Sequence, residues 1–156
     1  MPSGKYGGYE STLFKVLADG KIKVGVIGAF APNSFINSNG EWEGFEVDVA
    51  KRIAESLNAK IEFVEVTSDT RISSIETGKI DMCMGNSTRT MARSQKVAFT
   101  DTLIVSSERF LVKTDSGVNV IEDIPQGEKV GVTKGATMDE SIKRLRPDVE
   151  IVYYTS

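Results

Sequence analysis

The chain has 156 residues, of which 40% are hydrophobic and 26% charged, as expected for a globular protein with one ordinary hydrophobic core. Its net charge of −3, without a cluster of lysines and arginines, argues against a nucleic-acid partner, and no apolar run approaches the roughly 20 residues that cross a bilayer. There is no histidine and one cysteine, Cys83, which excludes an internal disulfide and removes the commonest catalytic base and metal ligand, so we expect no catalytic residue, metal or cofactor.

The first part of the chain alternates helix-like and strand-like segments after a Gly-rich stretch, residues 1–10, which we expect to be a flexible leader. Apolar residues at helical spacing predict helices, and short or alternating apolar runs predict strands. In chain order we expect a helix at 11–19, a strand at 21–27, an aromatic loop at 29–35, a helix at 46–57 ended by a left-handed Asn58, a strand at 60–66, a helix at 71–77 capped by Ser68 or Asp69, and a strand at 79–84. This order predicts an α/β fold with parallel strands.

Three polar residues, Asn86, Thr88 and Arg93, follow the strand expected at residues 79–84. Small ligands bind beyond the carboxyl ends of strands in open α/β sheets. An arginine pairs with both oxygens of a carboxylate, and Thr90 is expected to cap a short helix at 91–96 whose free N–H groups also face an anion. The pattern predicts a carboxylate site. The alternative is an exposed turn whose arginine makes a weak ion pair.

The second part of the chain begins with an extended stretch at residues 102–113, which has Ser106 and Ser107 near its middle. We then expect a strand at 129–132, a helix at 138–146 and a strand at 149–153. The strand at 129–132, KVGV, repeats the four letters of residues 23–26. Two readings are open: two similar lobes joined by an extended crossover, or two unrelated Val-rich strands.

Further motifs occur in a fixed order over residues 12–156. They are KVGV at 23–26 with FAP at 30–32, GEWEGFEVDVA at 40–50, TRI at 70–72, GNSTRTMARSQKVAFTD at 85–101, and VGV at 130–132 with GAT at 135–137. Together they resemble the motifs of the amino-acid-binding proteins of ABC importers, the solute-binding protein family 3. The segment at 85–101 is similar to that family's pattern of Thr-x-x-Arg followed by an apolar residue, Phe, Ser or Thr, and Asp.

The resemblance implies an α/β fold of the type II periplasmic-binding-protein class, with two lobes built on mainly parallel sheets. Lobe one would span residues 11–105, and residues 106–156 would form the first part of lobe two, with a hinge strand around Ser106 and Ser107. Members of the family continue beyond the segment that matches residues 153–156, so we expect an incomplete second lobe. An open sheet edge recruits other strands, so we expect one of two outcomes: a homodimer that exchanges lobe-two elements, or a chain that binds amino acids weakly through lobe one alone.

The resemblance also implies a set of substrate-binding residues from both lobes: Phe30, Arg71, Asn86, Thr88, Arg93, Thr133 and Thr137. In this set Arg93 grips the α-carboxylate of an amino acid, and Phe30 covers the aliphatic part of the ligand. The alternatives are an ordinary loop aromatic for Phe30 and a helix N-cap for Thr137. A second cleft arginine, Arg71, favours glutamate or aspartate, then glutamine, unless its role is structural.

The function that the resemblance implies is extracytoplasmic binding of a polar amino acid for delivery to the membrane subunits of an ABC transporter. The expected location is the periplasm or the outer surface of a cell, tethered to the membrane. Two alternatives share the fold: a ligand-sensing receptor domain, and a dehydratase acting on prephenate or arogenate. The dehydratase requires a general acid aimed at the leaving group, for which the sequence offers no candidate, so we expect no enzyme activity.

Overall fold

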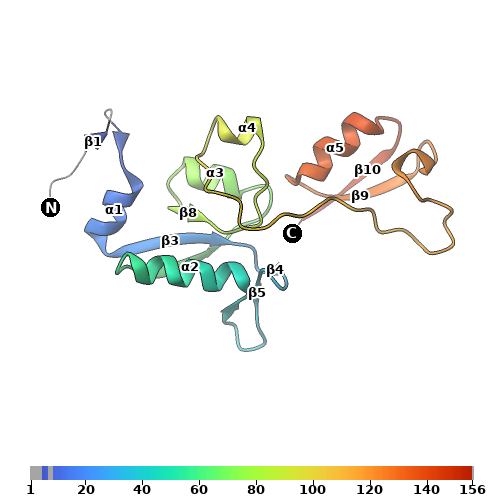
Figure 1. Ribbon diagram of the computed structural model, residues 1–156. Helices are drawn as coiled ribbons and strands as arrows, with labels where there is room; N and C mark the ends of the chain where they lie inside the picture. The colour runs from blue at the N-terminus through green and yellow to red at the C-terminus, as the bar shows by residue number, and fades with distance from the viewer. Residues whose placement is uncertain (1–4, 7–8, 156) are drawn as a thin grey trace. The chain divides into compact units, whose positions relative to one another are not determined.

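The computed structural model describes residues 5–6 and 9–155. The chain forms two compact units, Met1–Val97 (unit 1) and Ala98–Ser156 (unit 2), coloured blue to yellow and yellow to red in Figure 1. The leader expected at residues 1–10 lies partly outside the described residues, and its described part is an antiparallel pair, β1 (Lys5–Tyr6) and β2 (Tyr9–Glu10). Among the described residues, no helix has the length and apolar character needed to span a membrane.

Unit 1 is built on a parallel sheet whose three described strands have the order β7-β3-β8. The central strand β3 (Lys21–Val26) pairs along its whole length with β7 (Lys60–Glu65), whereas β8 (Met82–Cys83) pairs only with two residues of β3. Alternation along β3 directs Val24 and Val26 into the core, where neither has exposed surface. The predicted parallel sheet is therefore confirmed for this unit.

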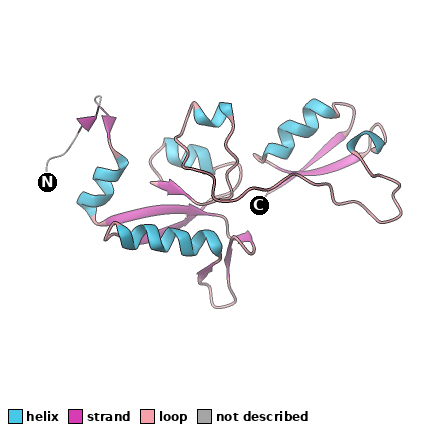
Figure 2. Ribbon diagram, in the orientation of Figure 1, coloured by secondary structure: helices cyan, strands magenta, loops and turns pink. Residues whose placement is uncertain are grey.

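Helix α2 packs against β3 and β7, and Figure 2 shows it running along β3. Its buried residues Val47, Ala50 and Ala54 recur at helical spacing, as the sequence predicts. Asn58 follows the end of α2 with a φ of 50°, the left-handed conformation predicted for it. The described helices of unit 1 are α1 (Thr12–Asp19), α2 (Phe45–Ser56), α3 (Arg71–Glu76) and α4 (Met91–Ser94).

A small antiparallel sheet, which the sequence did not predict, occupies the aromatic loop and the residues after it. Its strands are β4 (Ala29–Phe30), β5 (Ser34–Ile36) and β6 (Trp42–Glu43), in that order. Figure 1 shows β4 and β5 beside one end of α2. The main chain joins them there, because the N–H of Phe45 donates to Pro32 O at 3.1 Å. Gly44, with a φ of 123°, allows this approach, since a Cβ would collide with the Asn33 carbonyl.

Unit 2 contains a two-stranded parallel sheet, β9 (Lys129–Thr133) and β10 (Glu150–Tyr154), in the part of the chain that the structure describes. Helix α5 (Thr137–Leu145) connects the two strands, and its Ile142 is buried. A 3₁₀ turn, η1 (Ile121–Asp123), precedes β9. This β-α-β order matches the one predicted from the sequence.

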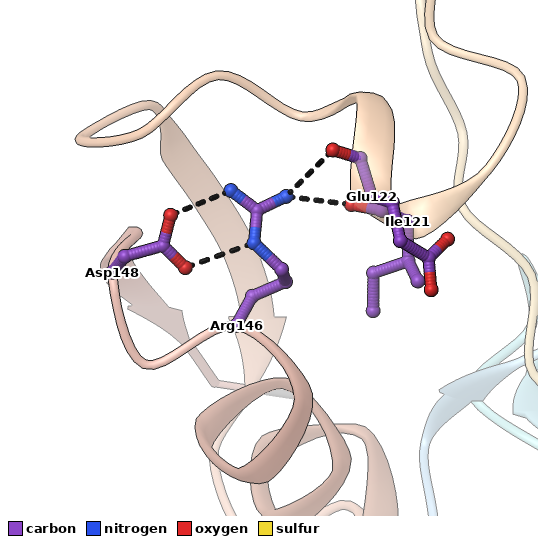
Figure 3. A network of polar contacts seen from close by, with 4 residues as sticks. All are labelled: Ile121, Glu122, Arg146 and Asp148. Atoms are coloured by element: carbon purple, nitrogen blue, oxygen red, sulfur yellow. Dashed lines mark hydrogen bonds and ion pairs between the residues drawn. The ribbon is translucent and has the colours of Figure 1, made fainter.

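Arg146, just beyond α5, ties η1 to the segment before β10 (Figure 3). Its Nε and Nη2 donate to the two carboxylate oxygens of Asp148 at 2.8 and 2.7 Å, and its Nη1 donates to Ile121 O at 2.7 Å. The hydrogen bond to Asp148 raises the pKa of Arg146, and the same bond lowers the pKa of Asp148. Arg146 therefore has a structural role, because it connects two segments of unit 2.

Several predicted details are wrong. Within the described residues, no strand is assigned to residues 102–113, so the expected hinge strand around Ser106 and Ser107 is an irregular segment. The N-cap of α3 is Thr70 and not Ser68 or Asp69, because Thr67 and Thr70 bond to each other there. The alternative reading of Thr137 as an N-cap also fails, because α5 begins at Thr137 and its N-cap is Ala136.

Candidate functional site

The polar loop, residues 85–90, is separated from the end of β8 by Met84 alone, and it leads into α4. Asn86 has a φ of 49°, an unusual conformation for a residue other than glycine. Thr90 caps α4 as predicted, since its Oγ1 accepts the N–H of Arg93 at 3.2 Å. The loop conformation is thus fixed at both ends, by the sheet on one side and by the helix cap on the other.

Thr88 and Arg93, both predicted as site residues, lie together. Arg93 is half-buried, and its Nη1 donates to Thr88 O at 2.8 Å. The Thr88 side chain is exposed, as is the neighbouring Arg89. This arrangement presents a guanidinium at the surface of the loop, where it suits the planar oxygens of a carboxylate.

Arg71 lies at the start of α3, and only 3% of its surface is exposed. Its Nη1 donates to Gly85 O at 2.7 Å and to Asn86 O at 3.1 Å, while its Nε has no hydrogen-bond partner among the described residues. Burial lowers the pKa of Arg71, and the nearby positive charge of Arg93 lowers it further. The guanidinium therefore faces the main chain of the polar loop, which fits the structural role that the sequence left open for it.

Glu46, which was not predicted from the sequence, reaches the same loop from α2. It is 5% exposed, and its Oε1 accepts the N–H of Asn86 at 2.9 Å. Burial raises the pKa of Glu46, although the Asn86 N–H and the Arg71 charge oppose that rise. A signal was present in the sequence, because Glu46 occupies the apolar stripe of α2 together with Ala50 and Ala54.

Ser34 of β5 lies beside the Glu46 carboxylate and is fully buried. Although these two groups are near neighbours, neither Ser34 Oγ nor Glu46 Oε2 has a hydrogen-bond partner of good geometry among the described residues. On the other side of the loop, burial raises the pKa of the Cys83 thiol, which makes it a poor nucleophile at neutral pH. No group of three or more metal-ligating His, Cys, Asp or Glu side chains occurs among residues 5–6 and 9–155.

The other predicted site residues occupy three separate elements. Phe30 lies in β4 and is 40% exposed. Thr133 is the last residue of β9, and Thr137 is the first residue of α5, both half-buried in unit 2. Their contribution to ligand binding stays a prediction.

Comparison with known proteins places most of the chain in one family. The sequence profile of the bacterial extracellular solute-binding proteins, family 3, matches residues 22–151. A glutamine-binding protein of Geobacillus stearothermophilus is 36% identical over 150 residues, which cover 92% of this chain and 56% of that protein. A histidine-binding periplasmic protein of Escherichia coli is 35% identical, over 76% of this chain and 45% of that protein. The chain thus spans about half the length of the curated relatives that it matches.

Solved structures show the same likeness. The crystal structure of an ancestral amino-acid-binding protein, described as a precursor of cyclohexadienyl dehydratase, matches with a TM-score of 0.86 and 35% identity, covering 92% of this chain and 65% of that one. A cysteine-binding protein from Campylobacter jejuni matches with a TM-score of 0.79 and 25% identity, covering 92% of this chain and 59% of that one.

Proposed function

The chain belongs to family 3 of the bacterial extracellular solute-binding proteins and has the type II periplasmic-binding-protein fold, and we propose from that premise that it binds a polar amino acid for an ABC transporter. The observation that carries this proposal is the polar loop. A half-buried Arg93 beside Thr88 offers the charge and the planar donors that an α-carboxylate requires. The buried positive charge of Arg71 behind the loop adds to the attraction for an anion.

The choice of amino acid turns on Arg71. The sequence favours an acidic ligand, glutamate or aspartate, because a second arginine suits a side-chain carboxylate. The guanidinium of Arg71 is buried, however, and its Nη1 is engaged by two carbonyls of the loop. Similar proteins are named for binding glutamine, histidine and arginine. We therefore propose glutamine as the first candidate, with glutamate and aspartate next.

Phe30, Thr133 and Thr137 are retained as proposed ligand contacts. The exposed ring of Phe30 offers an apolar surface for the aliphatic part of an amino acid. The two threonines carry hydroxyls that suit the polar part. The transporter's membrane subunits are the proposed partner, and the periplasm or the outer cell surface is the proposed location.

We propose that the chain binds its ligand without transforming it. A dehydratase would need a general acid that reaches the leaving group. The buried carboxyl of Glu46 accepts the Asn86 N–H and supports the loop instead. Incubation with prephenate or arogenate tests for dehydratase activity, and we expect no turnover above the spontaneous rate.

A thermal-shift screen of the common amino acids tests the proposed function most economically. A ligand at 100 times its dissociation constant stabilises the folded state by about 2.7 kcal/mol, which gives a clear rise in melting temperature. We expect the largest rise with glutamine and a smaller rise with glutamate or aspartate. No rise with any amino acid at millimolar concentration would contradict the proposal.

A further inference from the structure

The two loops that supply the proposed ligand contacts of unit 1 meet at one residue of α2. The aromatic loop, residues 29–35, carries Phe30, and the polar loop carries Asn86 and Thr88. The main-chain N–H of Glu46 donates to Asn33 O in the aromatic loop at 2.8 Å. Its side-chain Oε1 accepts the N–H of Asn86 in the polar loop at 2.9 Å. Glu46 therefore bonds to both loops at once.

The Asn86 main chain is held from two sides. Its N–H is bound by Glu46 of α2, and its carbonyl accepts Nη1 of Arg71 from α3 at 3.1 Å. Both side chains are at least nine-tenths buried. A positive φ is uncommon at a residue other than glycine, and asparagine is among the residues that tolerate it best. The hydrogen bonds with these two buried side chains hold the Asn86 main chain in this conformation.

We propose that Glu46 is a positioning residue for amino-acid binding. It fixes the positions of the aromatic and polar loops relative to each other, so that the ligand meets a preformed site. The proposal rests on the proposed function above. Glu46 acts through the Asn86 main chain and makes no contact with the ligand. A preformed loop raises affinity because less ordering remains to be done when the ligand binds.

Asp48 supplies a matched control. It is acidic and lies in the same first turn of α2, but its side chain is exposed. Both residues therefore share the favourable interaction of a carboxylate with the helix N-terminus, and only Glu46 reaches Asn86. A difference between variants at the two positions reports the loop contact rather than the stability of the helix.

The test combines titration calorimetry with hydrogen exchange of the Asn86 amide in the unliganded protein, on the whole chain. We expect Glu46→Ala to weaken binding about tenfold or more and to speed exchange at Asn86 beyond that of the sheet amides. Glu46→Gln should restore both within about threefold, because its amide oxygen still accepts the Asn86 N–H. Asp48→Ala should leave both unchanged. If Glu46→Ala does not fold, Glu46→Asp, shorter by one methylene, takes its place.

The outcomes separate this inference from the proposed function. Wild-type affinity and wild-type Asn86 exchange in Glu46→Ala would overturn the positioning role, as would a loss of affinity that Glu46→Gln does not restore. If the wild-type chain binds no amino acid, the proposed function fails, and the exchange of Asn86 alone decides whether Glu46 holds the loop. Unchanged exchange would then refute the contact as well.

Discussion

Arg93 and Arg89 lie four residues apart but in different surroundings. Arg93 is half-buried and donates to Thr88 O, whereas Arg89 is exposed. We expect Arg93→Ala to weaken amino-acid binding about a hundredfold or more, since a charge-assisted bidentate contact is worth about 3 kcal/mol. Arg89→Ala should bind as the wild type does. Titration calorimetry compares the two, and near wild-type affinity in Arg93→Ala would remove it from the site.

Arg71 is predicted to act on every ligand alike. Because its Nη1 satisfies Gly85 O and Asn86 O, Arg71→Gln should leave buried carbonyls without a donor and lower the free energy of unfolding by about 1–3 kcal/mol. Affinity for glutamine and for glutamate should fall by similar factors. Denaturant unfolding and calorimetry measure both effects. A selective loss of glutamate and aspartate affinity, with stability unchanged, would instead show that Arg71 reads an acidic side chain.

At the scale of secondary-structure elements, Asp81 lies just before β8 and bonds to both α1 and β3. Its Oδ1 accepts Lys15 Nζ of α1 and its Oδ2 accepts the N–H of Lys23 in β3, both at 2.9 Å. Burial raises the pKa of Asp81, but the bonds from Lys15 and Lys23 outweigh it, so the pKa lies below the ordinary 3.8. The native state therefore binds fewer protons than the unfolded state at acid pH. The stabilisation is complete above the ordinary pKa and is lost as the pH falls through the lowered one.

We accordingly expect Asp81→Asn to lower the free energy of unfolding at pH 7 by about 1–2 kcal/mol, the range for one partly solvated ion pair and one main-chain bond. The difference from wild type should shrink as the pH falls below 3.8. Glu55→Gln, an exposed acid-to-amide change on α2, is the control and should have little effect. Denaturant unfolding at several pH values decides the matter. A difference that does not change with pH would show that the charge of Asp81 is not involved.

The elements that the sequence predicts well are those with a repeating apolar pattern. Helix α2 and strand β3 follow directly from such patterns, and the parallel pairing of β3 with β7, on either side of α2 in the sequence, follows from the order of the elements. Strands β4–β6 have only two or three residues each, too few for any period to appear. Strand β8 begins later than its apolar run because the Ile80 N–H donates to Ser74 O, within α3, instead of joining the sheet.

The proximity of the candidate site residues follows from the sequence only where they lie in one short segment. Arg93, Thr88 and the Thr90 cap stand in one short segment, so their proximity follows from the sequence. The contact between Glu46 and Asn86 does not, because the position of Glu46 on the apolar stripe of α2 marks it as buried but gives no partner, and Asn86 lies forty residues away along the chain. The engagement of Arg71 by the loop carbonyls likewise depends on how α3 packs beside β8.

At the scale of the whole molecule, the described part of unit 2 leaves much apolar surface in water. Large side chains in its irregular segment and at its C-terminal strand, such as Val105, Leu111 and Tyr154, are more than half exposed. The sheet of β9 and β10 has open edges among the described residues. Exposed edges and apolar patches favour association with other chains. The predicted lobe boundary at residues 105/106 and the exchanged dimer both stay proposals.

We expect this chain either to form a dimer or larger assembly in solution, by exchange of elements of unit 2 between copies, or to bind amino acids only weakly through unit 1. Size-exclusion chromatography with light scattering gives the mass directly. As a control, Leu111→Ser and Val105→Ser should reduce association, because they remove exposed apolar side chains. A strictly monomeric chain that binds an amino acid with submicromolar affinity would overturn this expectation.

We propose that the polar loop recognises the α-carboxylate of an amino acid. The most direct measurement is a calorimetric titration with the amino acid that gives the largest thermal shift, and with its α-amide, in which a neutral carboxamide replaces the carboxylate. The wild type should bind the amino acid about a hundredfold more tightly than the amide, and Arg93→Ala should bind both equally weakly. Equal affinity of the wild type for the amino acid and its amide would contradict the claim.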